Sequence, residues 1–176
     1  MRELLEQIRM ALNANLYYLS LYVSLTLPDI CGAMASANGH ATAQKYKAWF
    51  DTYVAPKYRM TPSMAQATGR DLFLTAEECY IFRNSVLHQG SVQHPSNPWE
   101  RIWFFEPGSS SVVAHCNIVN NTLNLDVSVF CGDVINGVEE WLNAVEGIPQ
   151  FQNNYARFMQ RYPNGMPPLT HNPIIT

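Results

Sequence analysis

An arginine, an asparagine and a histidine lie close together on one stretch of this sequence. Arg83, Asn84 and His88 fall between residues 75 and 90. Arginine can hold two phosphate oxygens in its guanidinium fork, and a neutral histidine can take or give a proton near neutral pH. Asparagine can orient the imidazole or the phosphate. These side chains therefore have the chemistry to hold a phosphodiester and to move protons around it.

The two ends of this stretch predict a helix. Thr75 followed three residues later by Glu78 is a capping box, in which each side chain bonds the other's free backbone N–H. Gly90 stands where a left-handed C-terminal cap requires a residue without a Cβ. About four helical turns fit between them.

The spacing of the three polar residues sets their directions on that helix. Arg83 and His88 are five residues apart, so their directions differ by about 140° and we expect them not to share a face. Asn84 and His88 are four apart and do share one. A narrow apolar stripe also runs along the helix. We therefore expect one side to pack on its own subunit and another to face a cleft or a second subunit. The stripe consists of Cys79, Phe82 and Val86.

A purely structural role is the alternative for these residues. His88 lies in the last turn, where a cation suits the negative end of the helix dipole. Arg83 could lay its aliphatic stem on apolar surface as many arginines do. Short motifs also arise by chance, so the spacing alone leaves both interpretations open.

The run from Arg83 to His88, Arg-Asn-Ser-Val-Leu-His, resembles the signature of the HEPN superfamily (higher eukaryotes and prokaryotes nucleotide-binding). That signature is an arginine, a polar residue, three further residues and a histidine, late in a helix. The resemblance covers this short motif and an all-helical frame. It implies a helical bundle, usually a dimer in which two motif helices meet at a cleft, and for many members metal-independent RNA cleavage. Arg83, Asn84 and His88 would then be catalytic.

Polar residues near His88 are candidates for the rim of such a cleft. His94 beside His88 would suggest a metal pair, but a third ligand of suitable type and spacing is missing, so we expect neither metal nor cofactor. The substrate-binding candidates are Tyr80, Gln89, Ser91 and His94.

Composition indicates one folded domain without a broadly basic surface. The 176 residues are 47% hydrophobic and carry a net charge of −3. This argues against an extended nucleic-acid-binding face but permits a small phosphate site. Because only three residues are lysines, RNA contacts would rest mainly on arginine.

The sequence also indicates a reducing, cytoplasmic location. The four cysteines show neither a C-x-x-C pair nor zinc spacing. No secretory signal pattern opens the chain, and the apolar run at 10–27 is interrupted by polar residues.

Periodicity predicts a mainly α fold, a HEPN-like helical bundle over residues 1–162 with an irregular tail at 163–176. Residues 2–27 form a long helix that Pro28 ends or kinks, unless Pro28 opens a new short helix. Residues 55–74 are a loop. The remaining helices are expected at 41–54, 133–146 and 151–162, beside the helix between 75 and 90.

Residues 101–130 change to a period of two. Leu123, Leu125, Val127 and Val129 alternate with polar residues, and Asn120-Asn121 forms a turn. We expect a small antiparallel β-meander here, with one buried face packed on the bundle.

The helix at 41–54 carries an aromatic stripe that permits two interpretations. It is typical of a core face, and the alternative is a base-stacking wall beside the cleft. Lys45 and Lys47 would contact phosphate in the second case and mark a solvated face in the first. The stripe consists of Tyr46, Trp49, Phe50 and Tyr53.

Three functions compete. The first is a metal-independent endoribonuclease that leaves 2′,3′-cyclic phosphate ends, a toxin or phage-defence effector, with two Arg–His sets meeting across a homodimer axis. The second is a non-catalytic dimer that binds a nucleotide, RNA, or a partner such as an antitoxin or nucleotidyltransferase. The third is a structural dimer tied together by Arg83 and His88.

Overall fold

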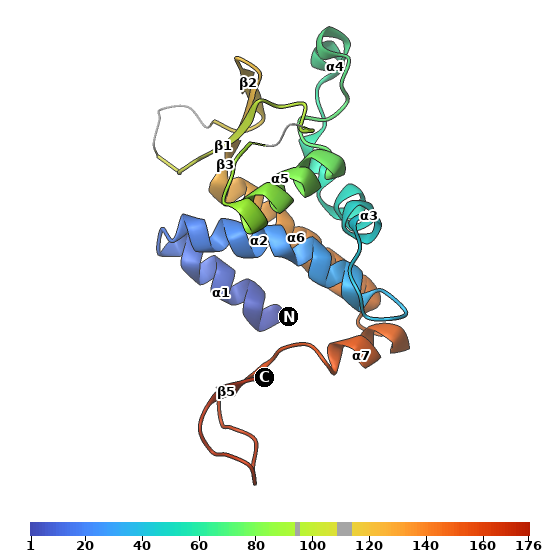
Figure 1. The fold of residues 1–176 in the computed structure, drawn as a ribbon, viewed down its shortest axis with the longest axis vertical. Helices are drawn as coiled ribbons and strands as arrows, with labels where there is room; N and C mark the ends of the chain where they lie inside the picture. Colours follow the sequence, from blue (N-terminus) through green and yellow to red (C-terminus); the bar gives the residue numbers. More distant parts are fainter. Residues whose placement is uncertain (94–95, 109–113) are drawn as a thin grey trace.

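The computed structural model describes residues 1–93, 96–108 and 114–176 (Figure 1). Most of these residues are helical, and a small sheet lies at one end of the helical body. The prediction of a mainly α chain with a small sheet is therefore confirmed. The helices are α1 (Arg2–Asn13), α2 (Tyr17–Met34), α3 (Ala43–Tyr53), the 3-10 helix η1 (Ala55–Tyr58), α4 (Pro62–Thr68), α5 (Ala76–Gln89), α6 (Val127–Val145) and α7 (Pro149–Tyr155).

The expected helix at 2–27 is two helices, so that prediction was wrong. Asn15 adopts a positive φ of 59° between α1 and α2, a conformation that asparagine tolerates better than most residues. Pro28 does not end α2, which continues to Met34. Leu27 and Cys31 on either side of it are fully buried, and this packing stabilises the helix across the proline.

The segment predicted as a loop at 55–74 contains η1 and α4. Thr61 accepts a hydrogen bond from the backbone N–H of Met64, Pro62 stands in the first turn, and Gly69 closes α4 with φ 67°. These are ordinary start and stop signals. The helix was missed because it is only seven residues long.

The sheet joins three strands in the order β1-β3-β2. β2 and β3 pair in antiparallel fashion across Asn120 and Asn121, which both have positive φ. β1 pairs with β3 in parallel, with Ile102 opposite Leu123, so the expected antiparallel meander was wrong for one of its two pairings. Alternation identifies strands but does not choose their partners. The strands are β1 (Arg101–Phe105), β2 (Asn117–Val119) and β3 (Thr122–Asp126).

The alternating pattern also extended too far, because α6 begins at Val127 rather than at 133. The Asp126 carboxylate accepts hydrogen bonds from the backbone N–H groups of Ser128 and Val129, at 2.8 and 3.0 Å, and so caps the helix. At the C-terminus α7 is shorter than the helix expected at 151–162. The strand β4 (Arg161–Tyr162) pairs there with β5 (Ile174–Ile175).

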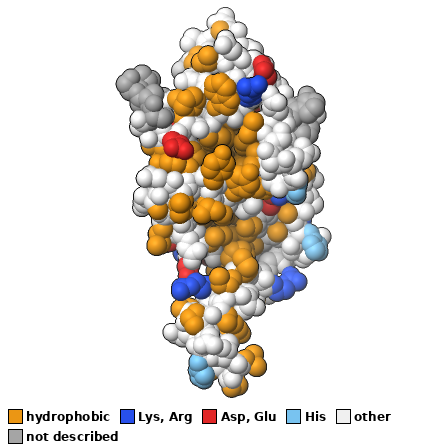
Figure 2. Space-filling view, turned by 60° about the vertical axis from the view of Figure 1, so that its left-hand side comes forward, with side chains coloured by type: hydrophobic (Ala, Val, Ile, Leu, Met, Phe, Trp, Pro, Cys, Tyr) orange, Lys and Arg blue, Asp and Glu red, His pale blue; other side chains and the backbone are white. Residues whose placement is uncertain are grey.

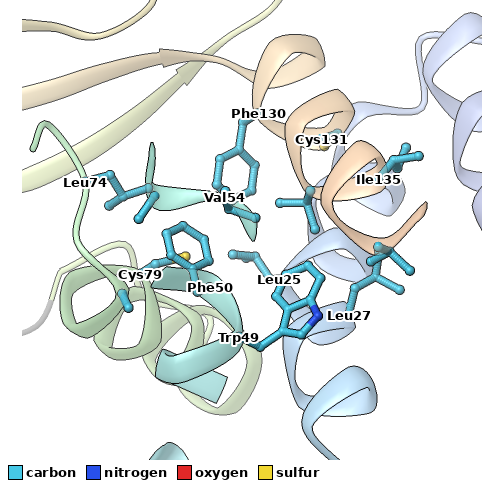
Figure 3. Packing of buried hydrophobic residues seen from close by; sticks show 14 of the residues in the cluster. Leu25, Leu27, Trp49, Phe50, Val54, Leu74, Cys79, Phe130, Cys131 and Ile135 are labelled. Atoms are coloured by element: carbon cyan, nitrogen blue, oxygen red, sulfur yellow. The ribbon is translucent and has the colours of Figure 1, made fainter. Parts of the chain in front are cut away.

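The core lies between α2, α3, α5 and α6 (Figure 3). Tyr46, Trp49 and Phe50 of α3 are buried in it, so most of the aromatic stripe is core and not an open stacking wall. α5 contacts both α2 and α3 and crosses above α2 in the view of Figure 1. Among the described residues, no helix combines the length and apolar character needed to cross a membrane.

Candidate active site on helix α5

Helix α5 has the caps that the sequence predicted. Thr75 Oγ1 accepts from the backbone N–H of Glu78 at 3.2 Å, and Glu78 Oε2 accepts from the backbone N–H of Thr75 at 2.9 Å. Gly90 follows the helix with φ 62°. The predicted stripe of Cys79, Phe82 and Val86 is buried, which fixes how α5 is rotated against the core.

The structure brings the three predicted catalytic residues together. Arg83 Nη1 donates to Asn84 Oδ1 at 2.7 Å and lies 3.4 Å from His88 Nε2. Their spacing in the sequence predicts different faces of the helix for Arg83 and His88. Their backbone directions do differ, but the long arginine side chain spans the difference. A single chain therefore assembles the cluster of Arg83, Asn84 and His88.

Asp29 of α2 joins this cluster through an ion pair with Arg83 Nη2. Each of the two side chains is only 17% exposed. Burial raises the pKa of the Asp29 carboxyl above its ordinary value, although nearby Arg83 and His88 act in the opposite direction. Sequence analysis missed this residue, because Asp29 stands 54 positions before Arg83 and only the packing of α2 on α5 brings the two together.

Tyr80 lies one turn before Asn84 and flanks the cluster. The Arg83 guanidinium carbon is 6.0 Å from the Tyr80 ring centroid, and Lys47 Nζ is 5.9 Å from it. The ring packs edge-on against Tyr46 at 5.2 Å. The structure thus places this predicted substrate-binding residue beside Arg83.

The other rim candidates are not joined to the cluster. Gln89 is exposed at the end of α5, and the Ser91 hydroxyl accepts from the backbone N–H of Gln93 at 3.2 Å, which closes a turn. Neither residue makes a hydrogen bond with Arg83 in the described part of the chain. The prediction for His94 lies outside the described residues.

Other reactive groups do not gather here. Within residues 1–93, 96–108 and 114–176, no three His, Cys, Asp or Glu side chains are placed to hold a metal ion. Cys79 is buried on the core side of α5, and burial raises the pKa of its thiol to about 12. It is therefore a packing residue and not a thiolate nucleophile.

The contact between Arg83 and His88 limits the state of the imidazole. A guanidinium can only donate, so a hydrogen bond between them requires that Nε2 carries no proton. The imidazole of His88 therefore lies beside a fixed positive charge. His88 is exposed, so its imidazole can be reached from solvent. An imidazole, a cation and an amide within one accessible cluster can bind an anion, and the imidazole can accept a proton once a bound ligand takes the guanidinium from Nε2.

No family model matches this chain, and no curated protein or solved structure matches it either. Its function is therefore inferred from the geometry of its own side chains.

Proposed function

We propose that this protein is a metal-independent endoribonuclease with a HEPN-like helical bundle and a site built from Arg83, Asn84 and His88. The proposal rests on one observation: Arg83 Nη1 contacts both other side chains, at 2.7 Å from Asn84 Oδ1 and 3.4 Å from His88 Nε2. In this arrangement a phosphate-binding cation and a proton-transfer group lie close enough to contact the same phosphodiester.

The reaction that suits these groups uses the RNA's own 2′-hydroxyl. A histidine removes its proton while the 2′-oxygen bonds to phosphorus, and Arg83 stabilises the added charge on the phosphate oxygens. The bond between phosphorus and the 5′-oxygen then breaks, and that oxygen takes up a proton. The products are a 2′,3′-cyclic phosphate and a 5′-hydroxyl. No metal is needed in this scheme.

Two proton transfers favour a site with two histidines, which a homodimer could supply. An apolar groove beside α5 supports a second copy as the partner, because monomers rarely leave such surface in water. Within it Tyr18 is 81% exposed and Trp103 is 45% exposed. Figure 2 shows hydrophobic side chains gathered over one broad face. The groove is lined by residues that include Tyr17, Tyr18, Leu21, Tyr22, Phe82, Val86 and Trp103.

Cleavage of mixed RNA in the presence of EDTA tests this proposal. His88→Ala should abolish cleavage, because it removes the proton-transfer group. Arg83→Ala should slow cleavage about 30-fold to 1,000-fold, since loss of one charge-stabilising donor costs about 2–4 kcal/mol of barrier. Asn84→Ala should weaken cleavage, because Asn84 only orients the other groups. His171→Ala, which changes an exposed histidine on the C-terminal tail, is the matched control and should cleave normally.

The structural alternative gives the opposite result. If wild-type protein leaves every tested RNA intact while His88→Ala lowers the melting temperature, these residues are interface ties and the ribonuclease proposal is wrong. A cytoplasmic toxin or phage-defence role with an antitoxin partner is proposed only on the basis of ribonuclease activity and fails with it.

A non-catalytic dimer that binds a nucleotide, RNA or a nucleotidyltransferase partner is the second candidate. It is favoured by one observation: the Arg83 charge is already balanced by Asp29, in a chain whose net charge is −3. Titration with a fluorescent nucleotide distinguishes the two functions. Tight binding that Arg83→Ala abolishes, without any RNA cleavage, would support this candidate.

A further inference from the structure

The guanidinium of Arg83 is held from two sides. Its Nη2 pairs with Asp29 of α2, while its Nη1 donates to Asn84 and approaches His88 on α5. A guanidinium is planar, so fixing one Nη atom fixes the direction in which the other points. Asp29 therefore determines where the Nη1 hydrogens lie.

This pair differs from the ion pairs on the surface. Arg2 and Glu146 also pair, but their side chains are 53% and 44% exposed, and water can replace either partner. Asp29 and Arg83 are each 17% exposed, and their neighbours Pro28 and Phe82 are buried. The backbone of α2 at Asp29 and that of α5 at Arg83 are therefore fixed by core packing. Separating the two residues would disturb that packing.

We propose that Asp29 is a positioning residue that holds the Arg83 guanidinium with its Nη1 directed at Asn84 and His88. The catalytic consequence of this inference rests on the ribonuclease function proposed above. Without Asp29 the guanidinium keeps its bond to Asn84 but loses its second anchor, so it can rotate about that bond toward solvent. The guanidinium and the imidazole would then no longer contact the same phosphate.

A double-mutant cycle on RNA cleavage tests whether Asp29 acts through Arg83. Asp29→Ala should lower kcat about tenfold to a hundredfold with little change in KM, as expected when a catalytic group is misplaced. In the Arg83→Ala background the same substitution should cost nothing further. Unchanged kcat in Asp29→Ala, or losses that multiply in the double variant, would overturn the proposal.

Asp29→Asn provides the conservative comparison. Asparagine keeps an oxygen acceptor at the same distance but removes the charge, so its kcat should lie between those of wild type and Asp29→Ala. Glu139→Ala is the matched control, because it removes the carboxylate that pairs with Arg9 at 2.8 Å on another part of the molecule. Its kcat should equal that of wild type. If the kcat of Asp29→Asn falls as far as that of Asp29→Ala, the orienting role of the oxygen is wrong.

A spectroscopic measurement makes the inference independent of activity. In ¹⁵N NMR, the Arg83 signals, assigned by their loss in Arg83→Lys, should show slow rotation with distinct Nη resonances in wild type and averaged resonances in Asp29→Asn. Averaged resonances in wild type would refute the positioning role even if RNA is cleaved. Distinct resonances in a protein that cleaves no RNA would refute the proposed function and leave the positioning role standing.

Discussion

Two adjacent glutamates at the start of α5 should respond very differently to substitution. Glu78 is 4% exposed, accepts from the backbone N–H of Thr75 and pairs with Arg70. Glu77 is exposed, and its side chain pairs with Lys47 at 2.6 Å. The two residues share a helix and a charge, so Glu77→Ala is a matched control for Glu78→Ala.

The structure gives the size of the difference. Glu78→Ala removes one capping hydrogen bond, worth about 1 kcal/mol. It also leaves the Arg70 guanidinium without its anion, 4.4 Å from the centroid of the Trp99 ring. Breaking a buried pair costs about 3–5 kcal/mol, and Arg70 is 26% exposed, so we take the lower end. We expect a total loss of about 3–4 kcal/mol, against about 0.5 kcal/mol or less for Glu77→Ala.

Urea unfolding followed by circular dichroism measures both variants. A loss of about 3 kcal/mol corresponds to a fall in Tm of roughly 6–12 °C for a chain of this size. Glu78→Gln keeps the cap and removes the charge, so it should lie between Glu78→Ala and wild type. If Glu78→Ala costs no more than Glu77→Ala, the buried pair does not anchor α5 and the reasoning fails.

Three further predictions concern the core and its titrating groups. Burial lowers the pKa of His115 below its ordinary 6.5, so near this pH the folded protein binds fewer protons than the unfolded chain. The contribution of His115 to the free energy of unfolding should therefore be constant above pH 6.5 and fall as the pH drops below it. Urea titrations at several pH values measure this, and a His115→Gln variant whose free energy of unfolding falls as steeply with pH would contradict it. Burial raises the pKa of Cys131 to about 11 and that of Cys116 to about 12, so iodoacetamide at pH 8 should modify them only after unfolding; mass spectrometry that finds rapid labelling of native protein would show the opposite. Phe130→Ala should lower the free energy of unfolding, measured by urea titration, by about 3–5 kcal/mol, because Phe130 is 1% exposed and its ring packs on Tyr58 and Phe104. A loss below about 1 kcal/mol would mean that the core relaxes around the cavity.

Local signals in the sequence were sufficient where the structure is decided locally. The capping box of Thr75 and Glu78 and the glycine at position 90 identify α5 within one residue at each end. Asp126 is the contrasting example. It lies at an alternating position of a strand-like run, yet its carboxylate caps α6 and ends the strand there. Both patterns were present, and only the tertiary packing decides between them.

Contacts between distant segments could not be predicted in this way. The parallel pairing of β1 with β3 depends on how the chain returns to the sheet, which no periodicity encodes. The same holds for Asp29, whose partner Arg83 lies on another helix. The sequence pointed to Arg83, Asn84 and His88 because they share one helix. It did not point to the carboxylate that pairs with Arg83.

Analysis of the product ends is the most direct test of the central claim that Arg83 and His88 cleave RNA without a metal. A defined single-stranded RNA is incubated with wild-type protein in EDTA, and the fragments are weighed by mass spectrometry. We predict fragments with 2′,3′-cyclic phosphate and 5′-hydroxyl ends from wild type and none from His88→Ala. Intact RNA with wild-type protein, or equal cleavage by His88→Ala, would contradict the claim.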